Sequence, residues 1–324
     1  MQVIETRHDQ TDPPVTLLAN ADPSIDPGQT SLRKFQVIFS FLIIYIVWGT
    51  TFYAIRVVVA TVPPFFSAAL RFLAAGSVLV AYAFLRKSFR STRRQLLNAA
   101  GISVLMFLIG YGGLFWSERS IDSGMAALLI ATIPVWIALL EVVVLKNGHI
   151  HPPLVVAIGL GLAGVGVLTL HFGHISVPVR AVIVLTIGQI AWSLGSVLSK
   201  KLSLPESKVV TAGVQMFIGG VALAVCSIAS GELAHPVEIS RSAGMALLYL
   251  AIPGSVVGFT AYVWLLGRVS PTIVGSYAYV NPVVALIVGY TLGNEIIGVR
   301  TLIGSMLVIS SVVVTLTFTR TARR

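Results

Sequence analysis

The stretch IVWGTTFYAIR at residues 46–56 has a counterpart in IAWSLGSVLSK at residues 190–200, and this pair decides the fold. The same spacing aligns FFSAALRFLAAG at 65–76 with VVTAGVQMFIGG at 209–220, which pairs Arg71 with Gln215. Further pairs follow in the same order, with spacings that differ by only a few residues: Trp116 with Trp264, Pro134 with Pro282, and Gly159 with Gly304. Chance similarity between apolar segments is the alternative, but ordered matches along the chain favour an internal duplication.

The composition places both copies in a membrane. Apolar residues make up 56% of the chain, charged residues only 10%, and the mean hydropathy is +0.91. A soluble domain carries about 25% charged residues because its surface must be hydrated. A soluble enzyme or a nucleic-acid-binding protein is therefore excluded. The apolar runs are continuous rather than alternating, which argues against a transmembrane β-barrel.

Ten apolar runs are long enough to span the bilayer, which takes about 20 helical residues. They are 36–60, 63–85, 96–116, 124–145, 154–172, 179–199, 209–229, 243–266, 271–293 and 298–318. We predict an all-α integral membrane protein with ten transmembrane helices in two five-helix repeats, 36–172 and 173–318. Residues 1–35 are predicted to form a disordered cytoplasmic tail, and residues 319–324 a basic cytoplasmic tail.

The distribution of basic residues predicts the orientation. Fifteen lysines and arginines fall in segments on the side of the two termini, and four on the other side, namely Arg119, Arg180, Arg241 and Arg300. Basic loops stay in the cytoplasm, so both termini are predicted to be cytoplasmic in the cell (inner or plasma) membrane. Five spans per repeat is an odd number, so the second repeat must be inverted relative to the first.

Inverted repeats are typical of secondary transporters, whose solute sites lie near the midplane where helices are interrupted. Pro134 and Pro282 fall near the middle of the fourth and ninth runs. Each proline removes a main-chain donor and frees a carbonyl that must find a partner. We predict helix breaks or gates at both prolines, with a simple kink as the alternative.

At this point the sequence resembles the drug/metabolite transporter superfamily, specifically its EamA-type ten-span exporters. The resemblance is carried by IVWGTTF (46–52), PPFFSAALRFLAAG (63–76), IDSGMAALLIATIP (121–134) and VGSYAYVNPVVALIVGYTLGNE (274–295). It implies export of small organic solutes from a bacterial cytoplasm. It also implies a central cavity lined by the first four spans of each repeat, with the fifth and tenth spans at the periphery.

The sequence departs from the family at carboxylates. The family's Glu after the fourth span of a repeat is present as Glu295, whereas Asn147 stands at the equivalent place in the first half. Related small multidrug exporters carry a Glu in the first span, where this chain has Ile46, Val47 and Trp48. Proton-driven cation exchange through such a carboxylate is therefore not expected.

Arg71 is predicted to lie near the centre of the second run, where a charged side chain costs roughly 2.5–3.5 kcal/mol to insert. Glu141 is the only carboxylate predicted well inside a run. The two residues differ in height by roughly 15 Å at about 1.5 Å rise per residue. Arg71 is therefore expected to bind main-chain carbonyls, hydroxyls or an anionic group of a solute.

The other polar and aromatic residues of the runs predict a mostly apolar pocket for amphipathic metabolites such as amino acids. Trp48 and Trp192 are predicted to lie deeper than Trp116 and Trp264, which suit the membrane interface. The predicted solute-binding residues are Trp48, Thr51, Arg71, Tyr111, Trp192, Gln215, Tyr279 and Asn281.

No catalytic group, cofactor or metal site is expected. His149 and His151 are separated from His171 and His174 by a helix of roughly 30 Å, too far to share a metal. Cys226 has no partner and is expected to be a small buried hydrophobe. The small residues Gly159, Gly161, Ala163, Gly164 and Gly166 predict close helix packing or a homodimer. A channel-like facilitator, a receptor or scaffold, and a membrane-embedded enzyme stay open as alternatives to a transporter.

The charge bias predicts the side of each loop. Reporter fusions after Arg94 and Lys201 should report cytoplasmic, and fusions near Asp122 and Glu238 external, because most of the basic residues lie on the first side. A paired phosphatase and fluorescent-protein reporter at each site measures this. Reversed signals at any two sites would contradict the inverted duplication.

Overall fold

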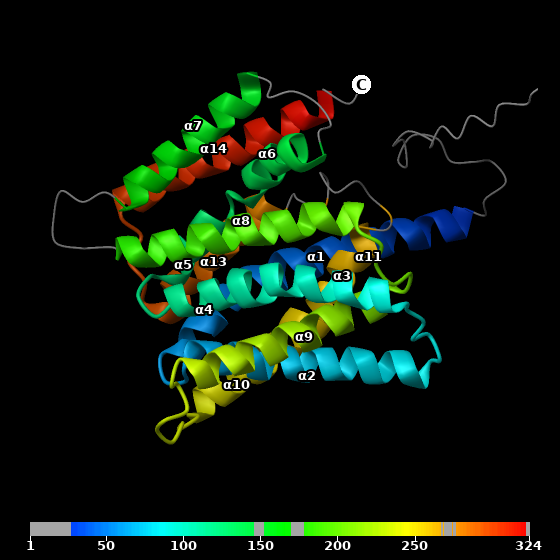
Figure 1. Cartoon of the computed structure of the whole chain (residues 1–324). Coiled ribbons are helices and arrows are strands. Elements are labelled where there is room, and N and C mark those ends of the chain that lie inside the picture. The colour runs from blue at the N-terminus through cyan, green and yellow to red at the C-terminus, as the bar shows by residue number, and fades with distance from the viewer. Residues whose placement is uncertain are drawn as a thin grey trace, which may run out of the picture.

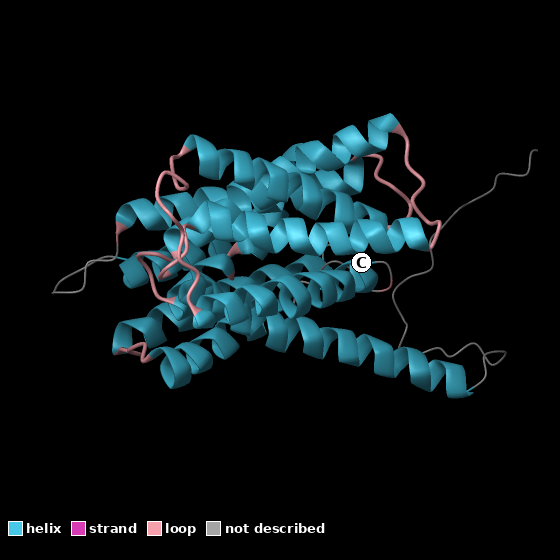
Figure 2. Ribbon diagram, turned by 90° about the horizontal axis from the view of Figure 1, so that it is seen from below, coloured by secondary structure: helices cyan, strands magenta, loops and turns pink. Residues whose placement is uncertain are grey.

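The chain is helical throughout the part that the computed structural model describes, residues 27–145, 152–169, 178–266, 268, 274 and 277–321. For a few of these, Tyr279 among them, only the main chain is described. No strand occurs in these ranges, which confirms the predicted all-α class. Figure 2 shows that the helices run roughly along one direction, with loops gathered at the two ends.

The helices fall where the apolar runs are. In chain order they are α1 (Pro27–Val59), α2 (Pro64–Leu85), α3 (Arg93–Ser103), η1 (Val104–Tyr111), α4 (Gly112–Ser117), α5 (Ser123–Ile130), α6 (Ile133–Leu145), α7 (Pro152–Thr169), α8 (Val179–Lys201), α9 (Lys208–Ala229), α10 (Arg241–Tyr249), η2 (Leu250–Val257), α11 (Gly258–Leu266), α13 (Tyr277–Gly293) and α14 (Val299–Thr321). In the described chain seven segments are long and apolar enough to cross a membrane, and 155–168, 280–293 and 299–314 are shorter apolar helices.

Both predicted tails are shorter than expected. Helix α1 begins at Pro27 rather than near residue 36, and α14 continues to Thr321. Once a long apolar helix exists, adding polar residues to its end costs little, because only nucleation is expensive. Pro27 is a suitable first residue, since a proline at the first position gives up no hydrogen bond. Residues 1–26 and 322–324 lie outside the described residues.

The first helix of each half packs against the helices of the other half. Helix α1 packs against α10, η2, α11 and α13 of the second half, and α8 packs against η1, α4, α5 and α6 of the first. Each half therefore completes the other, and the core cannot form from one repeat alone. This reciprocal pairing is the packing expected of a duplicated chain.

Helices α2 and α9, which are equivalent in the duplication, cross closely through two glycines. A Cβ on Gly76 would lie 2.5 Å from the main-chain nitrogen of Phe217, and a Cβ on Gly220 would lie 2.7 Å from that of Leu73. Neither position has room for a side chain, because main chain rather than a flexible side chain is in the way. Gly76 and Gly220 themselves align in the repeat, so the crossing is nearly symmetric.

Helices α7 and α14, the last of each half, lie side by side at one edge of the bundle (Figure 1). Their contact uses the small residues singled out above. A Cβ on Gly164 would lie 2.7 Å from the Val308 side chain, and one on Gly304 would lie 2.5 Å from Leu168. Ser311 also donates to the carbonyl of Ala157 at 2.6 Å. Gly161 and Gly164 of α7 therefore pack within the chain, whereas Gly159 and Ala163 are exposed.

Both third segments contain a π-helical stretch at the same place in the repeat. η1 (Val104–Tyr111) and η2 (Leu250–Val257) have the same length, and Pro253 lies inside η2. A π-helical turn is uncommon and often occurs at functional sites, since it widens the helix and redirects side chains. η1 contains no proline, and its single glycine, Gly110, did not predict a π-helical stretch.

The α2–α9 crossing predicts an unequal response to two glycine substitutions. Gly76→Ala should lower the unfolding free energy by about 1–3 kcal/mol, because its methyl group forces the two main chains apart. Gly101→Ala is the control, since a Cβ there meets nothing within 4 Å, and alanine favours a helix by up to about 1 kcal/mol. Thermal unfolding of the detergent-purified proteins measures both. Equal melting temperatures for the two variants would contradict the close crossing.

Candidate functional site

Arg71 lies on α2 in the middle of the bundle and is 1% exposed. Its Nε donates to Ser255 Oγ on η2 at 2.8 Å. The guanidinium carbon lies 4.8 Å from the ring centre of Phe72 and 5.0 Å from that of Tyr111. A hydroxyl was one of the predicted partners and is confirmed. The π-helical stretch η2 fixes the position of this hydroxyl, because Ser255 Oγ also donates to Leu250 O at 2.9 Å.

One guanidinium nitrogen of Arg71 lacks a hydrogen-bond partner among the described residues. That nitrogen is Nη1, which is buried. A buried donor of a charged group without a partner costs free energy, so its presence points to a ligand or a function. The free N–H groups are the type of donor that holds a carboxylate or several carbonyl oxygens.

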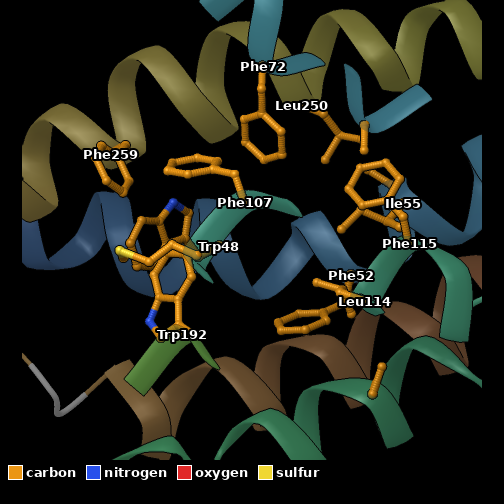
Figure 3. Packing of buried hydrophobic residues seen from close by; sticks show 14 of the residues in the cluster. Trp48, Phe52, Ile55, Phe72, Phe107, Leu114, Phe115, Trp192, Leu250 and Phe259 are labelled. Atoms are coloured by element: carbon orange, nitrogen blue, oxygen red, sulfur yellow. The ribbon is translucent and has the colours of Figure 1, made fainter. Parts of the chain in front are cut away.

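The rings that lie over this cation, Phe72, Tyr111 and Phe115, come from the first half, and rings of the second half lie beyond them. Trp192 meets Tyr111 edge to face at 5.3 Å, and Phe72 meets Phe107 in the same way at 4.9 Å. Figure 3 shows Trp48, Phe107, Trp192 and Phe259 turned toward one another beside Phe72. Trp48 and Trp192 are each 7% exposed. The structure thus brings together Trp48, Arg71, Tyr111 and Trp192, which come from four different helical segments.

Each residue of the WGTT stretch (48–51) on α1 has a defined contact. Trp48 Nε1 donates to Gly254 O on η2 at 3.0 Å. A Cβ on Gly49 would lie 2.6 Å from Val284, so glycine lets α13 approach. Thr50 Oγ1 and the Tyr249 hydroxyl are 2.5 Å apart, and Thr51 Oγ1 donates to its own helix at Trp48 O. Thr51 is therefore already satisfied within α1.

The fourth span is broken where Pro134 predicts a break. Helix α5 ends at Ile130 and α6 begins at Ile133, so Pro134 lies in the first turn of α6, where it gives up no hydrogen bond. The Ile133 carbonyl accepts from Ser193 Oγ of α8 at 3.4 Å. Thr132 Oγ1 donates to Gln189 Oε1, also on α8, at 2.5 Å. The break therefore faces protein, as predicted.

Pro282 is different, because the described part of α13 runs through it without interruption. Its neighbour Asn281 is 5% exposed. With the amide oriented to satisfy both its ends, Asn281 donates to Ile44 O at 3.3 Å and Tyr45 O at 3.1 Å. Asn281 thus fastens α13 to α1. The Tyr279 side chain lies outside the described residues.

A cluster of charges lies between α1, the α4–α5 turn and the end of α13. Glu295 Oε1 accepts from Ser123 N at 2.9 Å and from Ser123 Oγ at 2.6 Å, and Oε2 accepts from Gly124 N at 3.1 Å. The carboxylate therefore caps the start of α5, where N–H groups lack partners and negative charge is favoured. Arg56 lies 3.7 Å from Glu295 and 2.5 Å from Asp122.

Glu118 follows α4 and was not predicted to be buried. It is 2% exposed, and neither carboxylate oxygen has a hydrogen-bond partner among the described residues. Burial raises the pKa of the Glu118 carboxyl well above its usual range, and Glu295 raises it further, whereas Arg56 and Arg71 lower it. Sequence position alone suggested an exposed residue, since Glu118 is beyond the end of the apolar run.

Glu141, predicted as the carboxylate inside a span, is ion-paired with Lys200 of α8 and lies apart from Arg71. Gln215, the repeat counterpart of Arg71, is 4% exposed on α9, and its main-chain carbonyl accepts from Ser103 Oγ at 2.5 Å. Trp116 and Trp264 each carry an arginine over the ring, Arg180 at 5.4 Å and Arg268 at 3.9 Å. An arginine on each ring suits the predicted interfacial positions.

The described residues contain no group of three or more His, Cys, Asp or Glu side chains arranged to hold a metal ion. His149, His151, His171 and His174 lie outside the described residues. Cys226 is partly buried and forms no disulfide.

The sequence profile described as the EamA-like transporter family matches residues 36–170 and, separately, residues 179–317. This chain belongs to the EamA-like transporter family. It is 37% identical over 254 residues to the "Uncharacterized inner membrane transporter YedA" of Escherichia coli (strain K12), covering 78% of this chain and 81% of that protein. It is 25% identical over 272 residues to "Protein PecM" of Dickeya dadantii (strain 3937), covering 83% of this chain and 88% of that protein. The predicted EamA-type membership of the drug/metabolite transporter superfamily is confirmed.

A solved crystal structure has the same fold. It covers 89% of this chain and 99% of its own, with a TM-score of 0.62 and 21% sequence identity. This similarity supports the helical arrangement described above and carries no information on the solute.

The Glu295 cap predicts a stability loss on its removal. Glu295→Ala should lower the unfolding free energy by about 0.5–2 kcal/mol, because two N–H groups at the start of α5 lose their acceptor. Glu238→Ala, at an exposed carboxylate in the α9–α10 connection, is the matched control and should unfold as the unsubstituted protein does. Thermal unfolding in detergent measures the difference. An unchanged melting temperature for Glu295→Ala would contradict the cap.

Proposed function

We propose that this protein is a secondary transporter that exports small amphipathic or amino-acid-like solutes from the cytoplasm by alternating access. Its ten helical segments span the membrane as two inverted five-helix repeats, with both termini cytoplasmic. Membership of a transporter family supports transport rather than catalysis. The packing of α1 against the second half and of α8 against the first supports an inverted pair of repeats, since each half offers the other an equivalent surface.

The observation that carries the proposal is the unmatched Nη1 of Arg71 inside a ring of aromatic side chains. A solute carboxylate at this nitrogen would complete the hydrogen bonding of Arg71. The rings of Tyr111, Trp48 and Trp192 offer apolar area for the rest of the solute. Few polar groups in a mostly apolar site are typical of small-molecule binding.

The geometry also supports movement between two conformations. The Arg71 site is buried, so a solute reaches it only after helices separate at one end. The broken fourth span and the π-helical stretches η1 and η2 lie next to the site, and irregular helices of this kind move most easily. A channel-like facilitator is the second candidate. Saturable counterflow, which a carrier shows and a channel does not, separates the two.

Arg71 should govern transport more than folding. In proteoliposomes loaded with a radiolabelled amino-acid mixture, Arg71→Gln should reduce efflux by about 10-fold or more, because a hydrogen bond to a charged group contributes roughly 1.5–3 kcal/mol. Arg71→Lys should be impaired in part, because it keeps the charge but loses the planar set of donors. Both variants should reach the membrane at normal amounts, since Gln removes an insertion cost.

Glu141→Gln is the matched control and should keep substantial efflux, because Glu141 pairs with Lys200 away from the site. A ligand-induced thermal-shift screen with amino acids, nucleosides, sugars and cationic dyes identifies the solute class. Normal efflux by Arg71→Gln, or its degradation before it reaches the membrane, would remove Arg71 from the site.

A further inference from the structure

Glu118 is a buried carboxylate that the proposed solute site does not use. It ends α4, its N–H bonds back to Leu114 O at 3.0 Å, and its side chain is enclosed without a hydrogen bond among the described residues. An ionised carboxylate in such a position has lost its hydration and gained no donor in return. A protonated carboxyl would avoid most of this cost.

The cations near Glu118 are engaged by other groups. The charged groups that act on Glu118 are Glu295 beyond α13, Arg56 on α1 and Arg71 on α2. The Arg56 guanidinium pairs with Asp122 at 2.5 Å and lies 3.7 Å from Glu295, and Arg71 Nε donates to Ser255. An ionised Glu118 would therefore be a buried carboxylate without an ion pair among the described residues.

The other titratable groups at this end have partners or lie elsewhere. Glu232 accepts from Phe65 N and Phe66 N at the start of α2, and the Arg180 side chain lies over Trp116. The Tyr249 hydroxyl bonds Thr50, and Tyr111 lies against Arg71. Arg119 is exposed next to Glu118. Among the buried carboxylates Glu118 and Glu295, only Glu118 is left without donors.

We propose that Glu118 is a proton-binding site and that export of the solute is exchanged for the inward movement of one proton per cycle. The proton site follows from the burial of Glu118 and from its lack of an ion pair or hydrogen bond among the described residues, whereas its link to export rests on the proposed function.

The proposed topology places the α4–α5 turn at the outer face. When this end opens to release the solute, Glu118 meets the outer solution and takes a proton from hydronium, which leaves one water. The neutral carboxyl is buried again at lower cost than the carboxylate, so the outer end closes with the proton on Glu118. Opening toward the cytoplasm then releases that proton. The proton gradient thereby favours return of the empty protein and drives the solute outward.

Infrared spectroscopy tests the proton site without any solute. A pH titration of the purified full-length protein should show a carboxylic acid C=O band that persists above the ordinary range of Glu, near pH 4.3. The band should be absent from Glu118→Gln and present in Glu141→Gln. A shifted but present band in Glu118→Asp gives a second check if Glu118→Gln is poorly recovered. A wild-type spectrum without such a band, or an unchanged band in Glu118→Gln, would overturn the proposal.

Transport tests the coupling. With the radiolabelled amino-acid mixture, an imposed pH gradient should accelerate solute movement by wild type and Glu141→Gln by several fold. Glu118→Gln should respond less than twofold while retaining solute exchange at equal pH. A full gradient response in Glu118→Gln would overturn the coupling. No transport by the wild-type protein would contradict the proposed function instead, and the infrared band would still decide the proton site.

Discussion

Main-chain carbonyls that lose their helical partners inside the bundle must find donors, because lipid offers none. This requirement connects most of the irregular features of the fold. Ser193 supplies a donor at the break before Pro134, Ser255 at the π-helical stretch η2, and Trp48 at Gly254 beside it. Asn281 adds donors to two carbonyls of the uninterrupted helix α1. Each donor comes from a neighbouring segment or a neighbouring turn, so the irregular helices are held in place by the surrounding packing.

The same irregularity creates the candidate site. Ser255 both satisfies Leu250 O and accepts from Arg71, so the π-helical stretch positions a hydroxyl that binds the guanidinium. The rings of Phe72 and Tyr111 add favourable contact for a desolvated cation. One nitrogen is nevertheless left without a partner. Arg71 thus combines a fixed position with unused hydrogen-bonding capacity, which is what binding of a solute requires.

Two carboxylates near this site differ in the hydrogen-bond donors that surround them. Glu295 is surrounded by donors at the start of α5 and lies near Arg56, so its charge is stabilised where it is. Glu118, in the same neighbourhood, has no hydrogen-bond partner for either carboxylate oxygen among the described residues. A carboxylate with donors is suited to a permanent structural contact. A carboxylate without them is suited to gain and lose a proton as its surroundings open and close.

The sequence by itself determined the class of the protein. Its low charge and ten apolar runs required membrane helices, and the ordered repeats of Trp, Pro and Gly indicated the duplication. The break at Pro134 was also predictable, since a proline inside a helix removes a hydrogen bond, although the same reasoning predicted a break at Pro282 and α13 continues through that residue. The buried positions of Trp48, Trp192 and Arg71 followed from the same patterns. These features depend on composition and local geometry, which a sequence states directly.

Only the tertiary structure decided what each polar residue meets. Arg71 binds a serine 184 residues away, Glu141 binds Lys200, and Glu118 is enclosed although it follows an apolar run rather than belonging to it. The π-helical stretch η1 contains no proline, and the early start of α1 has no apolar signal. Such outcomes depend on the rotation and depth at which helices cross. The rotation and depth of each crossing are set by the packing of all the helices together, through contacts such as that of Gly76 with Phe217. The sequence of a single segment therefore does not determine them.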